Sequence, residues 1–231
     1  MSPGKFNLSV IIPSKNDERI FMDGFLNLLN FLKKKTWDSE IILVSNGSKK
    51  ENINLIKTDG EPYFKHLILK ESGKGLAIKE GIKESKHDYI LFMDADFSVS
   101  INELEKFLQN EKPIGNVVIG TRRTKDSINN GTPIIRKIGG AVYLFFVKAF
   151  FQLKITDTQC GFKLFKKSEY KIIKEIAYNN FSFDIELLYK LSKRNKIYEI
   201  PVQYNHHPDS KVSLFKDSFT MFFDLILLRF K

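Results

Sequence analysis

Short apolar runs alternate with amphipathic stretches through the first 120 residues of the chain. Uninterrupted apolar runs predict strands at residues 8–13, 40–44, 66–69, 88–93 and 116–120. Helical patterns lie between them, at residues 19–35, 73–85 and 102–109. Apolar strands that alternate with helices are typical of a mostly parallel sheet with helices on both faces, so we expect an α/β fold.

The pattern changes after residue 120. Residues 121–131 are polar, basic and rich in turn-forming residues, which predicts a loop. The rest predicts an amphipathic-to-apolar helix at 133–153, a strand-like stretch at 156–167, a helix at 183–194, a strand at 197–204 and a final amphipathic helix at 214–230. Neither a repeat nor a linker interrupts the chain, so we expect a single domain over residues 1–231.

Two carboxylates follow the predicted strand at residues 88–93. Asp94 and Asp96 are separated by one alanine and lie at the carboxyl end of this strand. Ligands bind at that edge of open α/β sheets. Carboxylate oxygens suit a hard divalent cation, Mg²⁺ or Mn²⁺, which shares its ligand shell with substrate phosphates. The pair therefore predicts a metal-diphosphate site, and the alternative is an acidic turn.

Polar turns also follow the other predicted parallel strands. Asn16 and Asp17 follow the first strand, and Asn46 follows the second. Lys74 lies between two glycines at the start of a predicted helix, where free backbone N–H groups favour an anion. Because parallel strands end at one edge, we expect these turns to surround one nucleotide diphosphate.

The net charge of +10 indicates an anionic partner. A phosphorylated substrate, an anionic lipid and a nucleic acid are the three classes that fit. A nucleic-acid-binding module would have no use for the two acids at the sheet edge, so we disfavour it and expect no nucleic acid. A nucleotidyltransferase also uses paired carboxylates, but it would leave residues 157–165 and the apolar helices unexplained.

The single cysteine and the apolar segments bear on location. Cys160 has no partner for an intrachain disulfide, which fits a reducing compartment. The first residues are polar and predict no signal peptide, and no run reaches the roughly 18–20 apolar residues that span a bilayer. We therefore expect a cytoplasmic protein.

Motifs along nearly the whole chain resemble the family-2 glycosyltransferases with a GT-A fold. They are Val10-Ile11-Ile12-Pro13 with Asn16-Asp17-Glu18, Gly73-Lys74-Gly75 with Gly81, Asp94-Ala95-Asp96, and Gly120-Thr121-Arg122. Residues 157–165, 183–188, 199–202 and 210–212 resemble, more narrowly, the polyprenyl-phosphate sugar synthases, with the dolichyl-phosphate β-glucosyltransferase branch the most similar. The resemblance implies a GT-A fold, in which residues 1–120 bind a nucleotide sugar and residues 121–231 bind the acceptor.

The resemblance also implies an activity and its residues. We expect inverting transfer of a hexose, glucose favoured, from UDP-glucose or, as the alternative, GDP-mannose, to a polyprenyl or dolichyl phosphate; a non-lipid acceptor is a further alternative. By motif position, the metal would be held by Asp94, Asp96 and Ser98. The nucleotide sugar would be bound by Pro13, Asn16, Asp17, Asn46 and Lys74. The acceptor phosphate would be bound by Arg122, Arg136 and Lys211.

Two positions depart from the family pattern. The second-strand turn usually carries two aspartates, but here it is Ser45-Asn46, which leaves the nucleotide base open. Ser98 stands where the mannosyl branch often has Gln, so one metal or diphosphate contact is missing or comes from water.

The last helix predicts contact with a membrane surface. Phe219, Phe222, Phe223 and Leu227 belong to an apolar stripe on residues 214–230, and residues 141–151 are almost wholly apolar. Basic charge favours an anionic leaflet, so we expect a peripheral protein at the membrane face. The alternatives are that the stripe packs on the core, in a homodimer or on a membrane-anchoring partner.

Three other features carry weaker hypotheses. Asp184 and Glu186 are candidate bases, but an ionised lipid phosphate needs none, and residues two apart on a helix do not share a face. His206 and His207 with Asp209 resemble metal ligands, but we interpret them as a surface loop. Cys160 is interpreted as a small buried residue.

Overall fold

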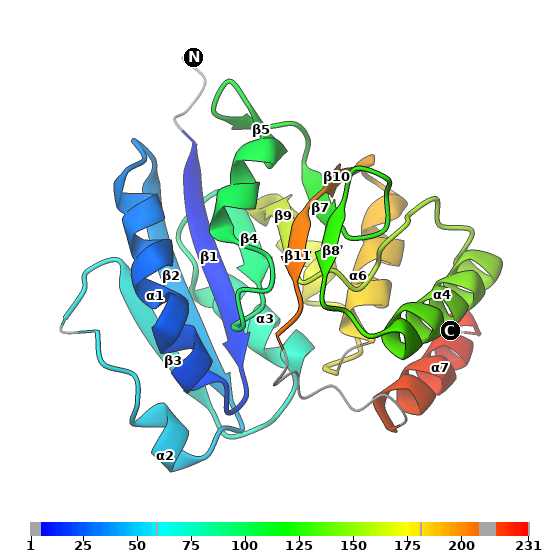
Figure 1. Cartoon of the computed structure of the whole chain (residues 1–231), viewed down its shortest axis with the longest axis horizontal. Coiled ribbons are helices and arrows are strands. Elements are labelled where there is room, and N and C mark those ends of the chain that lie inside the picture. The colour runs from blue at the N-terminus through cyan, green and yellow to red at the C-terminus, as the bar shows by residue number, and fades with distance from the viewer. Residues whose placement is uncertain (1–5, 59, 181, 208–215, 231) are drawn as a thin grey trace.

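A central sheet of seven strands organises the chain (Figure 1). The computed structural model describes residues 6–58, 60–180, 182–207 and 216–230, with only the backbone for 216–219. The strand order is β10-β7-β9-β4-β1-β2-β3. The strands are β1 (Asn7–Ser14), β2 (Asp38–Asn46), β3 (Phe64–Leu69), β4 (Tyr89–Met93), β7 (Val117–Thr121), β9 (Phe162–Lys166) and β10 (Ile197–Pro201).

Six of these strands run in one direction and β9 runs in the other. β9 pairs antiparallel with both β4 and β7, while every other neighbouring pair in this sheet is parallel. The expectation of a mostly parallel sheet is therefore confirmed. The carboxyl ends of the parallel strands lie along one edge, and β9 begins at that same edge.

Helices cover both faces of the sheet (Figure 1). On β1, Val10 and Ile12 belong to the core beneath α1, whereas Ile11 belongs to the core on the opposite face, as the period of two in a strand requires. Full burial of each such side chain contributes about 1.5–3 kcal/mol. The longer helices are α1 (Glu18–Lys33), α3 (Lys74–Glu84), α4 (Ile134–Phe151), α6 (Phe183–Ser192) and α7 (Lys216–Arg229).

Four expectations from the sequence are wrong in detail. The helix expected at 102–109 is a 3₁₀ helix, η1 (Ile101–Phe107), and the hairpin strands β5 (Leu108–Gln109) and β6 (Lys112–Pro113) follow it. The turn between these strands holds Asn110 and Glu111 at φ of 50° and 58°, which helix geometry does not allow. The apolar spacing of η1 reflects burial rather than an α-helical period.

The other three differences lie near β9 and β10. The expected loop at 121–131 contains β8 (Ile128–Asn130), which pairs with β11 (Gln203–Asn205). The strand expected at 197–204 is accordingly divided at Val202 between β10 and β11. Residues 156–161 form a turn before β9, because their backbone N–H groups bond carboxylates instead of a strand. Three short helices were not predicted: α2 (Lys50–Ile53), η2 (Lys167–Glu169) and α5 (Tyr170–Ile173).

Helices α4 and α7 lie side by side at one end of the molecule (Figure 1). Phe146 and Phe222 make an edge-to-face contact at 4.8 Å between ring centroids. Phe222 therefore faces α4, whereas Phe223 and Leu227 are exposed. In the described parts of the chain, no helix combines the length and the apolar character that crossing a bilayer requires.

We expect alanine to have opposite effects at two helical glycines. A Cβ at Gly81 of α3 would lie 2.5 Å from the buried Ile11 Cγ2, so Gly81→Ala should destabilise the fold by about 1–3 kcal/mol through overpacking. A Cβ at Gly139 of α4 meets nothing within 4 Å, so Gly139→Ala should stabilise by up to about 1 kcal/mol. Urea unfolding measures both. Equal effects at the two positions would contradict the close contact of α3 with β1.

Candidate active site

Asp94 and Asp96 emerge at the carboxyl end of β4, as the sequence predicts. The Asp94 backbone N–H donates to the Gly161 carbonyl at 3.1 Å, which joins the end of β4 to the start of β9. A Cβ at Gly161 would lie 1.8 Å from Asp94 Oδ2. The Asp94 carboxylate thus occupies the space that a side chain at 161 would fill, so any other residue there would displace it.

Asp96 is a largely buried carboxylate in the turn that follows β4. Its Oδ1 accepts a hydrogen bond from the Ser98 backbone N–H at 2.9 Å. Burial and the nearby Asp94 carboxylate raise the pKa of Asp96. Both effects penalise its negative charge, and a divalent cation between the two acids would reverse the penalty. Ser98 is buried, and its carbonyl accepts from the Asn205 N–H at 2.8 Å, so β11 holds this turn in place.

Asn16 links the turn after β1 to the segment after β2 by hydrogen bonds. Asn16 has a φ of 60°, and its Oδ1 accepts from the Lys49 backbone N–H at 2.8 Å and from Asn52 Nδ2 at 3.0 Å. Asp17 precedes α1, and its carbonyl accepts the Phe21 N–H at 2.9 Å. Pro13 lies next to the last residue of β1. The structure thus brings these three predicted nucleotide-binding residues to the same edge as Asp94.

Asn46 is buried and holds three segments together. Its Nδ2 donates to the Ser14 carbonyl at 2.7 Å, and its Oδ1 accepts from the Gly73 N–H at 2.9 Å. These bonds link the ends of β1 and β2 to the start of α3. The amide therefore already has backbone partners on both sides, and its predicted contact with the nucleotide stays a prediction.

Lys74 begins α3 and lies between two carboxylates. Its Nζ is 3.0 Å from Asp94 Oδ1 and 3.4 Å from Asp184 Oδ2. Burial would lower the pKa of Lys74, but the two carboxylates raise it well above its usual value, so the ammonium stays charged. This places a cation directly beside the predicted metal-binding acid.

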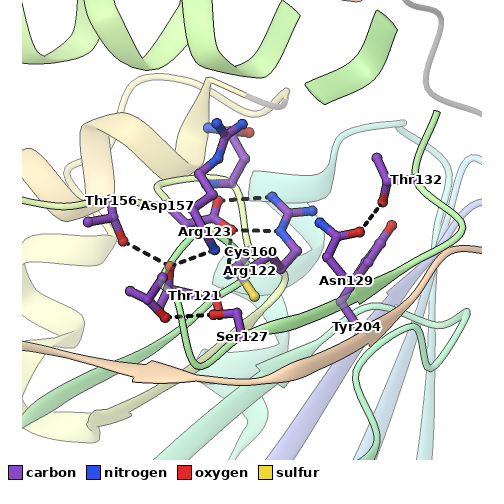
Figure 2. A network of polar contacts seen from close by, with 12 residues as sticks. Thr121, Arg122, Arg123, Ser127, Asn129, Thr132, Thr156, Asp157, Cys160 and Tyr204 are labelled. Atoms are coloured by element: carbon purple, nitrogen blue, oxygen red, sulfur yellow. Dashed lines mark hydrogen bonds and ion pairs between the residues drawn. The ribbon is translucent and has the colours of Figure 1, made fainter. Parts of the chain in front are cut away.

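Arg122 forms a two-pronged ion pair with Asp157 (Figure 2). Its Nε and a terminal nitrogen donate to Asp157 at 2.7 and 2.9 Å, and its backbone N–H donates to the same carboxylate at 3.1 Å. Burial alone would raise the pKa of Asp157, but the Arg122 guanidinium holds it below its usual value. Glu199 in turn accepts from the backbone N–H groups of Thr156 and Asp157, which fixes the turn that carries Asp157. This turn belongs to the motif at residues 157–165, but the motif alone did not predict the roles of Asp157 and Glu199.

A basic cavity of about 460 Å³ lies beside this ion pair. Arg122, Arg123, Arg136 and Lys137 line it together with Tyr204 and His206. Burial and then the neighbouring Arg136 lower the pKa of His206, so its imidazole is favoured in the neutral form. The cavity therefore presents fixed positive charge, and it suits an anion. Arg122 and Arg136 come together here as predicted, whereas Lys211 lies outside the described residues.

The remaining candidates are explained by packing. Cys160 is buried, and burial raises the pKa of its thiol to about 12, which makes it an unreactive core residue. Glu186 is buried and accepts from the backbone N–H groups of Ala177 and Tyr178. Throughout the ranges described above, no cluster of three or more His, Cys, Asp or Glu side chains could hold a metal ion. His206 and His207 are thus not part of such a cluster, and Asp209 lies outside those ranges.

Comparison with known proteins identifies the family. The model of glycosyl transferase family 2 matches residues 9–173. A dolichyl-phosphate beta-glucosyltransferase of Dictyostelium discoideum is 31% identical over 97% of this chain and 74% of its own length. The human protein of that name is 31% identical over 100% of this chain and 76% of its own length.

Solved structures show the same fold. Glucosyl-3-phosphoglycerate synthase from Mycobacterium tuberculosis, in complex with Mn²⁺, uridine-diphosphate-glucose and phosphoglyceric acid, superposes with a TM-score of 0.66. It covers 97% of this chain and 79% of its own, at 15% sequence identity. At that identity the likeness carries the GT-A fold and nothing further.

We expect Arg122→Ala to destabilise the protein by about 3–5 kcal/mol, because it leaves the buried Asp157 carboxylate unpaired. The sign of the pH dependence follows from the lowered pKa of Asp157. In the wild type its contribution is present above the unfolded-state pKa of about 3.9 and is lost as the pH falls. In the variant, protonation of Asp157 relieves the unpaired charge.

The difference in stability between the two proteins should therefore narrow as the pH falls from 7 to about 4. Chemical unfolding at several pH values measures it, with the exposed Lys125→Ala as a control that should change little. A difference that is small at pH 7, or that widens with acid, would contradict the assigned ion pair.

Proposed function

The chain belongs to glycosyl transferase family 2, and from this premise we propose that it transfers glucose from UDP-glucose to a polyprenyl phosphate of the dolichyl type. The observation that carries the proposal is the position of Asp94 and Asp96 at the sheet edge that also holds the arginine-lined cavity. The relatives named dolichyl-phosphate beta-glucosyltransferase support a glucosyl group and a dolichyl-phosphate acceptor, since they match the chain almost end to end. Mannosyl transfer from GDP-mannose is the alternative for the sugar.

A divalent cation, Mg²⁺ or Mn²⁺, fits the acids that are present. Asp94 and Asp96 offer oxygen ligands, and burial together with the neighbouring Asp94 carboxylate raises the pKa of Asp96. The absence of a side chain at Gly161 leaves room for the Asp94 carboxylate. When bound, the cation would neutralise negative charge on the departing nucleotide diphosphate. We assign the cation to Asp94 and Asp96, with Ser98 supporting Asp96 through its backbone.

The acceptor needs positioning more than deprotonation. A lipid phosphate is already an anion near neutral pH, so it attacks the anomeric carbon without a general base, and cations hold it in line. Arg136 and Arg122 face the cavity that would receive it, and Lys211 is assigned to the same role by its motif. Two donors of Arg122 are bonded to Asp157, so Arg122 is held rigidly for this purpose. A single displacement would convert an α-linked donor to a β-linked product.

Helices α4 and α7 would bring the active site to the lipid. The large apolar side chains that stay exposed on these helices, or directly after α7, are Ile134, Ile135, Ile138, Val142, Phe145, Phe223, Leu227 and Phe230. These eight residues are the α4–α7 apolar face. Arg136 and Lys137, near the start of the same helix, line the cavity, so the apolar face would bring this basic cavity to the membrane surface. We therefore propose peripheral attachment at the membrane surface.

The transfer reaction tests the proposal directly. Protein incubated with radiolabelled UDP-glucose and a polyprenyl phosphate should yield a labelled lipid in the presence of Mg²⁺ or Mn²⁺, and chelation should abolish the product. Asp96→Ala should lower the rate by about 100-fold or more, since even indirect support of a metal is worth up to that factor. The exposed Asp23→Ala serves as the matched control.

The same assay separates the acceptor from the donor. Arg136→Ala should raise the KM for the lipid phosphate while the affinity for UDP-glucose, measured by calorimetry, stays unchanged. Full activity of Asp96→Ala in a folded protein would refute the metal assignment. Failure to transfer any of a panel of nucleotide sugars to lipid phosphates would refute the proposed reaction.

Vesicle co-sedimentation tests the membrane attachment. The protein should bind vesicles that contain anionic lipid, and replacing Phe223, Leu227 and Phe230 with Ser should release it, because each apolar side chain contributes about 1.5–3 kcal/mol when buried. The matched control replaces exposed apolar residues elsewhere, Leu26 and Ile68. Equal binding of both variants would show that the α4–α7 apolar face is covered by another protein or by a second copy of the chain.

A further inference from the structure

A row of four alternating charges leads from the interior of the sheet to Asp94. Lys163, on the central strand β9, lies 2.5 Å from Asp184 Oδ1, and both side chains are 1% exposed. Lys74 lies 3.4 Å from the other oxygen of Asp184, and it also contacts Asp94 at 3.0 Å. From the interior to the sheet edge the order is Lys163, Asp184, Lys74 and Asp94. Each of these charges therefore contacts a charge of opposite sign.

The surroundings of Asp184 favour its ionised form. Burial alone would raise the pKa of Asp184, but Lys163 and Lys74 lower it. Asp184 also lies in the first turn of α6, where the helix dipole favours a negative charge. Lys163 Nζ donates to the Cys160 carbonyl at 2.6 Å and lies 4.9 Å from the centre of the Phe92 ring. A buried ion pair of this kind is costly to build, and replacing it with apolar residues often leaves stability unchanged, so stability alone is a poor reason for its presence.

The backbone brings α3 and α6 unusually close at this point. A Cβ at Gly75 would lie 2.7 Å from atoms of Phe183, the residue before Asp184. The Gly75 N–H donates to the Asn179 carbonyl at 2.8 Å. Glycine after Lys74 therefore allows the start of α3 to approach the start of α6, and Lys74 comes within reach of Asp184.

We propose that Asp184 is a positioning residue that holds the Lys74 ammonium at the sheet edge, where Lys74 binds the diphosphate of the donor, and that Lys163 is the fixed counter-ion of Asp184. This inference rests on the proposed function. A lysine with four rotatable bonds loses side-chain entropy when it is ordered. Asp184 makes that ordering part of the folded protein, so the donor does not have to impose it on binding.

The arrangement argues against Asp184 as a general base. Both of its oxygens face ammonium groups, its side chain is shielded from solvent, and its pKa lies below its usual value. A base needs an oxygen within hydrogen-bond reach of the proton that it removes. In this structure Lys74 stands between Asp184 and the reaction edge, so Asp184 acts through Lys74.

A mutant cycle with UDP as the probe tests this. Lys163→Met combined with Asp184→Asn removes the inner pair without leaving a buried charge, and Lys74→Met removes the ammonium. Calorimetry with UDP, with and without Mg²⁺, should show that each variant loses about tenfold in affinity or more, the loss expected for one charge-assisted hydrogen bond. The triple variant should bind UDP no more weakly than Lys74→Met, because residues that act through one another are not additive. Lys83→Met, an exposed lysine on the same helix, should bind as the wild type does.

Three results would overturn the inference. The paired variant could bind UDP like the wild type, or its loss could multiply with that of Lys74→Met. Alternatively, turnover at saturating donor could fall by several orders of magnitude with UDP affinity intact, which would make Asp184 a base. If the paired variant does not fold, Gly75→Ala replaces it, since it separates α3 from α6 without changing a charge and should weaken UDP binding likewise. Failure of the wild type to bind UDP, with or without Mg²⁺, would instead count against the proposed function.

Discussion

The reversed direction of β9 is the constraint on which the active site depends. A seventh parallel strand would enter the sheet at the opposite edge, and the turn before it would lie far from the carboxylates. Because β9 runs antiparallel between β4 and β7, the turn at residues 156–161 reaches the edge where Asp94 emerges. That turn supplies Gly161, which makes space for Asp94, and Asp157, which fixes Arg122. One strand direction thus connects the two acids at the sheet edge to the basic cavity.

Local patterns in the sequence predicted the strands and helices that form the sheet edge. Apolar runs of four to six residues marked β1, β2 and β4, because strands buried on both faces carry no polar positions. The acids after β4 and the turns after β1 and β2 followed from this placement. The direction of β9 and the pairing of β8 with β11 depend on contacts between residues 44 to 77 positions apart, which no local period predicts. The pairing of Arg122 with Asp157 could not be predicted either, because the sequence does not distinguish an arginine that pairs with a buried acid from an exposed arginine.

Charge in this protein is organised in two ways. The +10 net charge reflects many exposed lysines, and it describes the surface. Near the candidate active site, by contrast, two buried carboxylates are each held by a cation: Asp157 by Arg122 and Asp184 by Lys163. Each pair replaces the hydration that burial removes from its charges. The site therefore resists deformation, and a bound anion meets dipoles and charges that are already oriented.

Helix α4 carries apolar residues on its exposed side and Arg136, Lys137 and Tyr143 along the cavity. An α-helix behaves as a stiff rod over this length, so a tilt that adjusts one side must also move the other. If such a tilt couples the two sides, thermodynamic linkage makes the coupling reciprocal. Binding at the apolar side would then change the affinity of the cavity for an anion by the same factor as an anion in the cavity changes the affinity of the apolar side for its partner. Gly139 and Gly140 lie within this helix, between Lys137 and Tyr143. The stiffness of the helix at these two glycines would therefore affect how strongly its apolar side and its cavity side are coupled.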